Sequence, residues 1–330
     1  MTEQLQHKAS TGYLLVGTGT PDDATLPAVR RYLDQFLMDA RIISVPSILR
    51  RFIVNRILES RPQQTVKVYE EVRLSEGLPF RVYSQGLLSA MREAWLAVDP
   101  TADTSLLKIA SRYGQPSIAD ALRQFSDQAV QKVKVLPLYP QQAFCTTYSV
   151  LDELERLRKS VPGLPQIELI YDYHLHPAWL QAVADSIQIE GLPPAPFHLL
   201  FSFHSIPLKD QRHGDIYIQQ VIESCQAITR ILGLDDTQWS IAYQSRFDKA
   251  RSWQGPFLEA HIHDLLKQGV ERLLIATPGF AVDCTETLYD IDKQINQKLG
   301  NDMQISRISC LNDYPAHAQA LLEVLGVGAG

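Results

Sequence analysis

The chain has 330 residues, 45% of them apolar, which is enough to bury the cores of two domains. The formal net charge of −6 gives no basic excess, so nucleic acid is not expected as a partner. No apolar run reaches the roughly 18 residues of a membrane-spanning helix. The four cysteines form no CxxC pair or other compact metal-ligand pattern, which fits a reducing cytoplasm. We expect a cytoplasmic protein that is soluble or peripheral to the inner membrane.

Short apolar segments alternate with segments of helical spacing along the first half of the chain. The apolar segments predict strands at 13–17, 105–113 and 132–138. The spacing predicts helices at 28–37 and 150–158, and Pro116-Ser117 opens another helix with Ser117 as its N-cap.

The second half repeats this rhythm. Further strands are predicted at 167–171, 198–203, 239–243 and 272–277. Further helices are predicted at 178–187, 217–232, 257–267 and 285–299. Strands that alternate with helices are typical of parallel sheets covered on both faces. The sequence therefore predicts an α/β protein with two Rossmann-like domains, 1–162 and 163–330, which meet near the turn-forming run 161–165.

Residues 30–61 depart from this pattern, because they carry seven arginines against three acidic residues, with large apolar residues between them. Such a segment can line a pocket for an anionic apolar ligand, or it can rest on a membrane surface. The plainer alternative is an ordinary solvated helix with one buried face, and the pattern alone favours this alternative.

His204 is the first candidate for chemistry, because it lies where the apolar strand at 198–203 ends. Ligands of open parallel sheets bind outside the carboxyl ends of the strands. A neutral imidazole at that place can accept a proton or hold a metal ion. A histidine that only bonds to nearby backbone is an equally good interpretation of this position.

Glu286 is the second candidate, because it also follows a buried strand and opens a predicted helix. Asp290 lies four residues further on, so both carboxylates fall on one helix face and can pass cations or protons along it. A structural interpretation competes with this one. Asp283 as N-cap and Glu286 three residues later have the spacing of a capping box, and the pattern alone favours the cap.

Other motifs are weaker. The pairs His174-x-His176 and His261-x-His263 have chelate-like spacing, but residues two apart on a helix point to different sides. The loop 17–21 follows the first strand yet lacks the full glycine fingerprint of a nucleotide site.

Several segments together resemble the ferrochelatase family, in the family's order and over almost the whole chain. The N-terminal segments are Gly19-Thr20-Pro21-Asp22, Arg112-Tyr113-Gly114-Gln115-Pro116-Ser117 and Leu136-Pro137-Leu138-Tyr139-Pro140-Gln141. The most specific segments are Phe203-His204-Ser205-Ile206-Pro207, Gln244-Ser245-Arg246-Phe247 and Pro278-Gly279-Phe280 through Glu286-Thr287-Leu288. The Pro-Gly-Phe-Ala-Val-Asp-Cys form is similar to that of the proteobacterial branch.

The resemblance implies a porphyrin cleft between two Rossmann-like domains, in which Fe²⁺ is inserted into protoporphyrin IX as the terminal step of haem biosynthesis. It implies that His204 and Glu286 are the catalytic and metal-binding residues, with Asp290 as an acidic relay. It also implies that the cleft is lined by six further residues: Thr18, Arg112, Tyr113, Tyr139, Thr146 and Trp253. Residues 30–61 would form the lip of this cleft and a peripheral membrane contact, and the last helix would pack back on the first domain.

No resident cofactor is implied, because Fe²⁺ is a substrate, and the scattered cysteines predict no iron–sulfur cluster. Gly17-Thr18 departs from the Asn-Leu or Asn-Met of many relatives, so these motifs do not settle which porphyrin is preferred. Two alternatives stay open. One is a non-catalytic porphyrin or haem carrier or sensor, and the other is a chelatase for another metal or tetrapyrrole. The sequence does not fix the oligomeric state.

Overall fold

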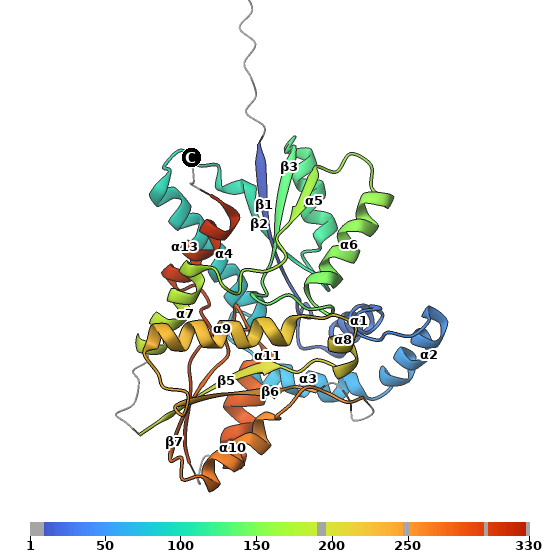
Figure 1. Cartoon of the computed structure of the whole chain (residues 1–330). Coiled ribbons are helices and arrows are strands. Elements are labelled where there is room, and N and C mark those ends of the chain that lie inside the picture. Colours follow the sequence, from blue (N-terminus) through green and yellow to red (C-terminus); the bar gives the residue numbers. More distant parts are fainter. Residues whose placement is uncertain (1–9, 190–195, 247, 249–250, 300–302, 328–330) are drawn as a thin grey trace, which may run out of the picture.

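The computed structural model describes residues 10–189, 196–246, 248, 251–299 and 303–327. Two parallel four-stranded sheets with helices around them form the molecule (Figure 1). This confirms the predicted α/β class. Within the described residues no helix combines the length and the apolar character needed to cross a membrane.

The first sheet has the strand order β2-β1-β3-β4. Its strands are β1 (Thr11–Gly17), β2 (Leu107–Ser111), β3 (Lys132–Pro137) and β4 (Gln166–Leu169). Around it lie α1 (Leu26–Leu37), α2 (Ser47–Ile57), α3 (Arg61–Val72), α4 (Pro79–Val98), α5 (Ile118–Asp127) and α6 (Thr147–Ser160). The predicted cap of α5 is confirmed, because Ser117 Oγ accepts a hydrogen bond from the Asp120 backbone N–H at 3.1 Å.

The second sheet has the strand order β6-β5-β7-β8. Its strands are β5 (His198–His204), β6 (Trp239–Gln244), β7 (Arg272–Ala276) and β8 (Gln304–Arg307). Its main helices are α7 (Pro177–Ile189), α9 (Tyr217–Leu232), α10 (Leu258–Lys267) and α13 (Pro315–Leu325), and α8 (Leu208–Arg212) is a single short turn.

The segment predicted as one helix at 285–299 is divided into three parts. It is an α-helix only at α11 (Thr285–Thr287) and α12 (Asn296–Leu299), with the π-helix η2 (Leu288–Ile295) between them. Contacts with other elements hold η2 in place, since Arg307 of β8 donates to Asp292 at 2.7 Å and Lys293 of η2 donates to the Glu71 carbonyl of α3 at 2.5 Å. The expectation of a continuous α-helix was therefore wrong.

The central strands of both sheets are buried because they carry apolar residues on both faces. On β1, Leu14 and Val16 pack with α5 and α6, whereas Leu15 points to the other face. Leu15 belongs to a cluster that also contains Phe201 of β5 and Trp179 of α7. One apolar core thus joins the two sheets and fixes how they lie relative to each other.

The crossing from the first sheet to the second comes later than the sequence pattern suggests. β4 lies beyond the expected boundary between residues 162 and 163, yet it pairs with β3 in parallel, so the first sheet extends to Leu169. After the second sheet the chain returns, and α13 packs on α4 and α7. The Lys134 ammonium of β3 donates to the Leu325 carbonyl at the end of α13, at 2.7 Å.

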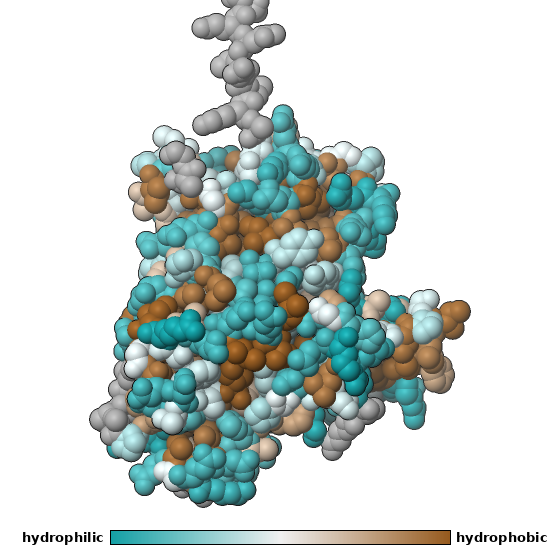
Figure 2. All heavy atoms as spheres, in the orientation of Figure 1, coloured by the Kyte–Doolittle hydropathy of each residue, from teal (hydrophilic) through white to brown (hydrophobic). Residues whose placement is uncertain are grey.

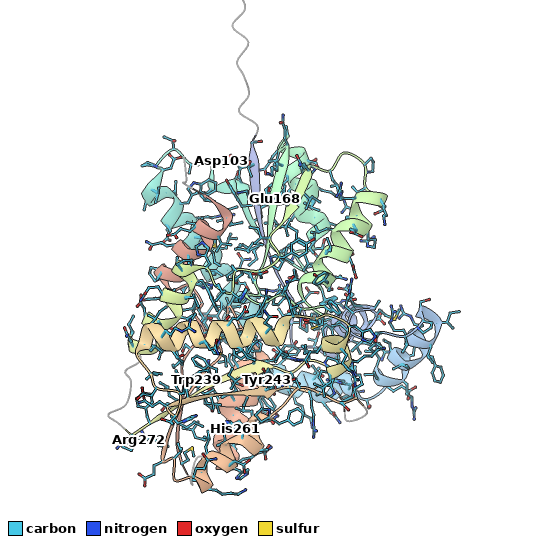
Figure 3. The ribbon with its side chains drawn as sticks, viewed as in Figure 1. Asp103, Glu168, Trp239, Tyr243, His261 and Arg272 are labelled. Carbon is cyan, nitrogen blue, oxygen red and sulfur yellow. The ribbon has the colours of Figure 1, made fainter. Side chains whose placement is uncertain are left out.

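The strand directions bring the carboxyl ends of both sheets toward one region. Figure 3 labels Trp239 at the outer end of β6 and Tyr243 nearer the middle, and Asp103 lies just before β2 at the opposite end of the molecule. α9 crosses between the two sheets in this view (Figure 1). Ligand sites of such folds lie beyond the carboxyl ends of the strands.

A histidine clamp fixes the segment that connects the two sheets. His174 Nδ1 lies 2.8 Å from Asp172 on the same segment, and His174 Nε2 lies 2.9 Å from Glu223 on α9. Burial alone would lower the pKa of His174, but the two carboxylate hydrogen bonds outweigh it and raise the pKa. The clamp is therefore strongest when the ring carries its proton.

We predict that His174→Gln lowers the free energy of unfolding by about 1 kcal/mol near pH 6. Because the pKa of His174 is raised by folding, the stabilisation is complete below its usual value of 6.5 and is lost as pH rises through the raised value. Urea unfolding of wild type and His174→Gln at pH 6 and pH 9 measures the free energy of unfolding of each protein. The exposed His263→Gln is the control, and an equal loss at both pH values would contradict the clamp.

Candidate functional site

One cavity with two lobes lies where the carboxyl ends of β1, β2, β3, β5 and β7 meet. The inner lobe has a volume of about 200 Å³ and the outer lobe about 760 Å³. The lobes share His204 and Glu286, which follow the carboxyl ends of the neighbouring strands β5 and β7 of the second sheet. The outer lobe lies within the ordinary size range of ligand sites.

Every site residue named from the sequence lines this cavity. Thr18, His204 and Glu286 line both lobes. Four residues line only the inner lobe: Arg112, Tyr113, Tyr139 and Thr146. Asp290 and Trp253 line only the outer lobe. The structure therefore brings together residues that lie up to 272 positions apart between Thr18 and Asp290.

His204 ends β5 and offers one ring nitrogen to the cavity. Its Nδ1 lies 2.7 Å from the Ser205 carbonyl oxygen, which can only accept a hydrogen bond. Nδ1 therefore carries the proton in the neutral ring, and Nε2 keeps its lone pair. The backbone bond that the sequence left as an alternative is thus present, and it fixes the ring's tautomer while the side chain still faces the cavity.

Glu286 does not cap its helix, so the capping box favoured by the sequence pattern was wrong. The N-cap of α11 is Cys284, whose backbone N–H donates to Thr287 Oγ1 at 3.1 Å. The backbone N–H of Asp283 donates instead to Asn312 Oδ1 at 2.8 Å. Glu286 accepts a hydrogen bond from the neighbouring Thr285 hydroxyl at 2.8 Å, and its carboxylate faces both lobes.

Asp283 is buried and anchors the start of this acidic segment from outside the cavity. Its carboxylate accepts hydrogen bonds from Arg307 Nη1 and Asn312 Nδ2, both at 2.8 Å, and from Thr287 Oγ1 at 2.7 Å. These contacts hold the turn from which Glu286 projects.

Asp290 lies on η2, just beyond Glu286, and its carboxylate accepts a hydrogen bond from the Ser245 hydroxyl at 2.5 Å. Burial raises the pKa of Asp290 to about 6. The Ser245 hydrogen bond lowers it, Glu286 raises it, and His204 lowers it slightly. π-Helical turns are frequent at functional sites, and here one carries a carboxyl group that titrates near neutral pH.

Asp39 is a buried acid that the sequence reasoning missed, and it organises one wall of the inner lobe. Its Oδ2 accepts hydrogen bonds from Arg112 Nη2 at 2.6 Å, Tyr113 Oη at 2.8 Å and Ser149 Oγ at 2.5 Å. Arg112 Nε also donates to Ser149. The guanidinium of Arg112 is thus neutralised by a carboxylate behind it, although the side chain lines the cavity.

The loop after β1 fits tightly against its neighbours. A Cβ atom on Gly17 would lie 2.4 Å from Cζ of Phe80, so the ring of Phe80 occupies the space of a side chain at position 17. Gly19 has a φ of +93°, and a Cβ there would lie 1.9 Å from the Tyr113 carbonyl. These glycines serve close packing around the cavity, and Thr18 Oγ1 meets Tyr139 Oη at 2.6 Å.

The histidine pairs that the sequence offered as weaker candidates do not line this cavity. His174 is held by two carboxylates, and His261 Nε2 lies 2.9 Å from Ser240 Oγ. Among the described residues, no group of three or more His, Cys, Asp or Glu side chains is placed to hold a metal ion. Phe247, the last residue of the motif at 244–247, lies outside the described residues.

We predict that the free energy of unfolding of the wild type falls between about pH 4 and pH 6, and that Asp290→Asn abolishes this fall. Because the folded carboxyl binds its proton more tightly than the usual pKa of 3.8, wild-type stability falls as pH rises toward 6. Over this pH range the free energy of unfolding of the wild type falls by at most about 3 kcal/mol. Denaturant midpoints from pH 4 to 7 measure it, with the exposed Asp236→Asn as control. Parallel curves for wild type and Asp290→Asn would contradict the raised pKa.

Comparison with known proteins identifies the family of the chain. The ferrochelatase family model matches residues 10–326. The chain is 37% identical to the ferrochelatase of Xylella fastidiosa strain M12, over 96% of this chain and 97% of the relative. It is 35% identical to the coproporphyrin III ferrochelatase of Streptococcus mutans, over 95% and 97%.

Solved structures agree on the fold. SirB from Bacillus subtilis, solved with Fe³⁺, superposes with a TM-score of 0.58 at 13% identity, over 97% of this chain and 96% of SirB. At that identity the likeness bears on the fold alone. The cavity between two parallel sheets, the family match over nearly the whole chain and the curated relatives lead to one conclusion. The chain belongs to the ferrochelatase family, the metal chelatases that insert iron into porphyrins.

Proposed function

We propose that this chain inserts Fe²⁺ into protoporphyrin IX to form protohaem, with the porphyrin held in the cavity between the two sheets. The observation that carries this proposal is that His204, whose Nδ1 is bonded to the Ser205 carbonyl, and the acid Glu286 both line both lobes of the cavity. The family match supplies the reaction class, and the residue roles below are our assignments.

The reaction requires a base. A free-base porphyrin carries two inner N–H protons, and Fe²⁺ replaces both of them, so two protons must leave for each metal ion inserted. His204 Nε2 is the proposed first acceptor, because its lone pair is available while Nδ1 donates to Ser205. The resulting imidazolium is stabilised by the Glu286 carboxylate, and Asp290, with its pKa of about 6, relays protons or cations toward the outer lobe.

The same two side chains provide a loose nitrogen and oxygen site for incoming Fe²⁺. Such donors release a metal ion more readily than a cage of thiolates does. A site for a metal ion that is a substrate must release that ion into the macrocycle. His204 and Glu286 fit this requirement.

The lining of the inner lobe favours protoporphyrin IX over coproporphyrin. Protoporphyrin has its two propionates on one side of the ring and apolar groups on the other, whereas coproporphyrin carries four propionates. The inner lobe is walled by apolar residues such as Phe80, Leu138 and Val282, and its guanidinium, Arg112, is already paired with Asp39. Burying a propionate there would leave a charge without a free cation.

The proposal includes no resident cofactor and no iron–sulfur cluster. Cluster ligation requires thiolates. Burial raises the pKa of Cys145 to about 12, and burial raises the pKa of Cys225, Cys284 and Cys310 well above the usual value. Cys225, Cys284 and Cys310 are buried and Cys145 lines the cavity, and we assign none of the four to a cluster.

We predict that His204→Ala and Glu286→Gln each lower the rate of iron insertion at saturating porphyrin by about a hundredfold or more, because each removes a group that handles the leaving protons. Anaerobic insertion of Fe²⁺ is followed by the loss of porphyrin fluorescence. The matched controls are His263→Ala and Glu323→Gln, which are exposed on α10 and α13.

We also expect kcat/KM to be at least about tenfold higher for protoporphyrin IX than for coproporphyrin III.

Three outcomes would contradict the function. Wild type that binds protoporphyrin without inserting iron would favour a carrier or sensor. Variants of His204 and Glu286 that keep the wild-type rate would contradict the proposed roles. A preference for coproporphyrin III would contradict the argument from the inner lobe.

The proposal also places the protein at the cytoplasmic surface of a membrane, in contact through α2. This helix projects from the body of the molecule, and Figure 2 shows hydrophobic residues on the projecting arm. Ile48 is 87% exposed and Phe52 is 72% exposed, so α2 leaves two large apolar side chains in solvent although it buries Val54. α2 also carries three arginines and no acid, but Arg51 pairs with Asp34 and Arg56 with Glu59, so the proposed contact with an anionic bilayer depends mainly on the apolar side chains.

The helix is held firmly at its base. Arg50 donates to three backbone carbonyls, those of Met38, Ile43 and Val45, at 2.7–3.0 Å. The apolar face is therefore presented on a fixed arm.

We predict that the double variant Ile48→Ser, Phe52→Ser lowers the fraction of protein that sediments with vesicles containing anionic lipid, because it removes most of the exposed apolar area on α2. The matched control is Val98→Ser, which removes a residue that is 71% exposed at the end of α4. Equal sedimentation of wild type and the double variant would contradict the membrane contact.

A further inference from the structure

The outer lobe is rich in arginine, and its arginines differ in what they already bind. Four of them line it: Arg41, Arg61, Arg246 and Arg251. A porphyrin in this cavity must place its carboxylates against cations, and an arginine whose charge is already compensated contributes less.

Two of these arginines have carboxylate partners. Arg41 forms two hydrogen bonds with Asp152, at 2.7 and 2.9 Å, and its guanidinium lies over the rings of Phe144 and Tyr148. Arg251 Nε donates to Asp248 at 2.7 Å, and its guanidinium lies 4.6 Å from the ring of Trp253. A third, Arg61, is half-buried and also has a partner.

Arg246 is different. Its side chain is exposed, and its guanidinium lies 5.0 Å from the ring centre of Phe257. Within the part of the chain that the structure describes, this ring is the only partner seen for the guanidinium, which makes no ion pair or hydrogen bond there. Stacking on a ring leaves the planar edge of the guanidinium, with its N–H donors, open to a ligand.

The local backbone explains how Arg246 reaches the rim. It lies two residues beyond β6, after Ser245, whose φ of +60° turns the chain sharply. Ser245 uses its hydroxyl to bind Asp290, while the next side chain reaches the wall of the outer lobe. One turn thus holds an acid of the proposed relay and presents a cation beside it.

We propose that Arg246 is the specificity-determining residue that pairs with a propionate carboxylate of the porphyrin. The carboxylate takes the open edge of the guanidinium, and Phe257 holds the guanidinium plane from behind. This inference rests on the proposed function for the identity of the ligand, a porphyrin, and not on turnover.

The test is a fluorescence titration of the full chain, without iron, using protoporphyrin IX and protoporphyrin IX dimethyl ester in the same detergent. Arg246→Gln should raise the Kd for protoporphyrin IX by about tenfold or more, because a charge-assisted hydrogen bond is lost. It should leave the Kd for the ester unchanged. Arg246→Lys should restore only part of the affinity, since lysine lacks the planar fork.

Arg158→Gln is the matched control, because Arg158 is an exposed arginine on the last turn of α6, away from the cavity. Wild-type affinity of Arg246→Gln for protoporphyrin IX would overturn the proposal, and so would an equal loss for acid and ester. Wild type that discriminates acid from ester through Arg246 but inserts no iron would contradict the proposed function and leave this inference standing. Absence of any porphyrin binding by wild type would overturn both.

Discussion

The shared apolar core between the two sheets is the constraint on which the rest of the structure depends. Leu15 of β1 and Phe201 of β5 belong to one buried cluster, so the sheets cannot move apart without exposing it. Because all strands in each sheet are parallel, this fixed arrangement opens the carboxyl ends of both sheets onto one cavity. The chemistry is then assembled from loops at those ends, each short and each held by contacts behind the cavity wall.

The cavity has a clear division of charge. On its inner side Arg112 is compensated by Asp39, which leaves a largely apolar wall. Glu286 and Asp290 follow one another along α11 and η2 toward the outer lobe, and burial keeps the second of them easy to protonate. His204, whose tautomer is set by Ser205, lies where the two environments meet. This arrangement suits a reaction in which a neutral, apolar macrocycle exchanges two protons for a dication.

Sequence reasoning predicted β1 to β7, because buried parallel strands read as continuous apolar runs, but it gave no helix for α2, α3 or α4. It also named nine residues that all line the cavity: position and spacing pointed to His204, Glu286 and Asp290, and the family motifs supplied the other six. It missed Asp39, since the partners of this acid lie 73 to 110 residues away and no local pattern reveals them. It assigned the wrong helix cap, because Thr287 competes with Glu286 for the cap and only the fold decides. In the sequence, the short strand β8 cannot be told from a loop, and the π-helix cannot be told from an ordinary α-helix.

The most direct test of the account is a crystal structure of the full chain with metal-free protoporphyrin IX bound. The account predicts that the macrocycle spans both lobes, that its inner nitrogens lie within hydrogen-bond reach of His204 Nε2, and that Glu286 lies on the same side. The apolar edge should enter the inner lobe. A porphyrin bound outside this cavity, or one whose inner nitrogens face away from His204, would contradict it.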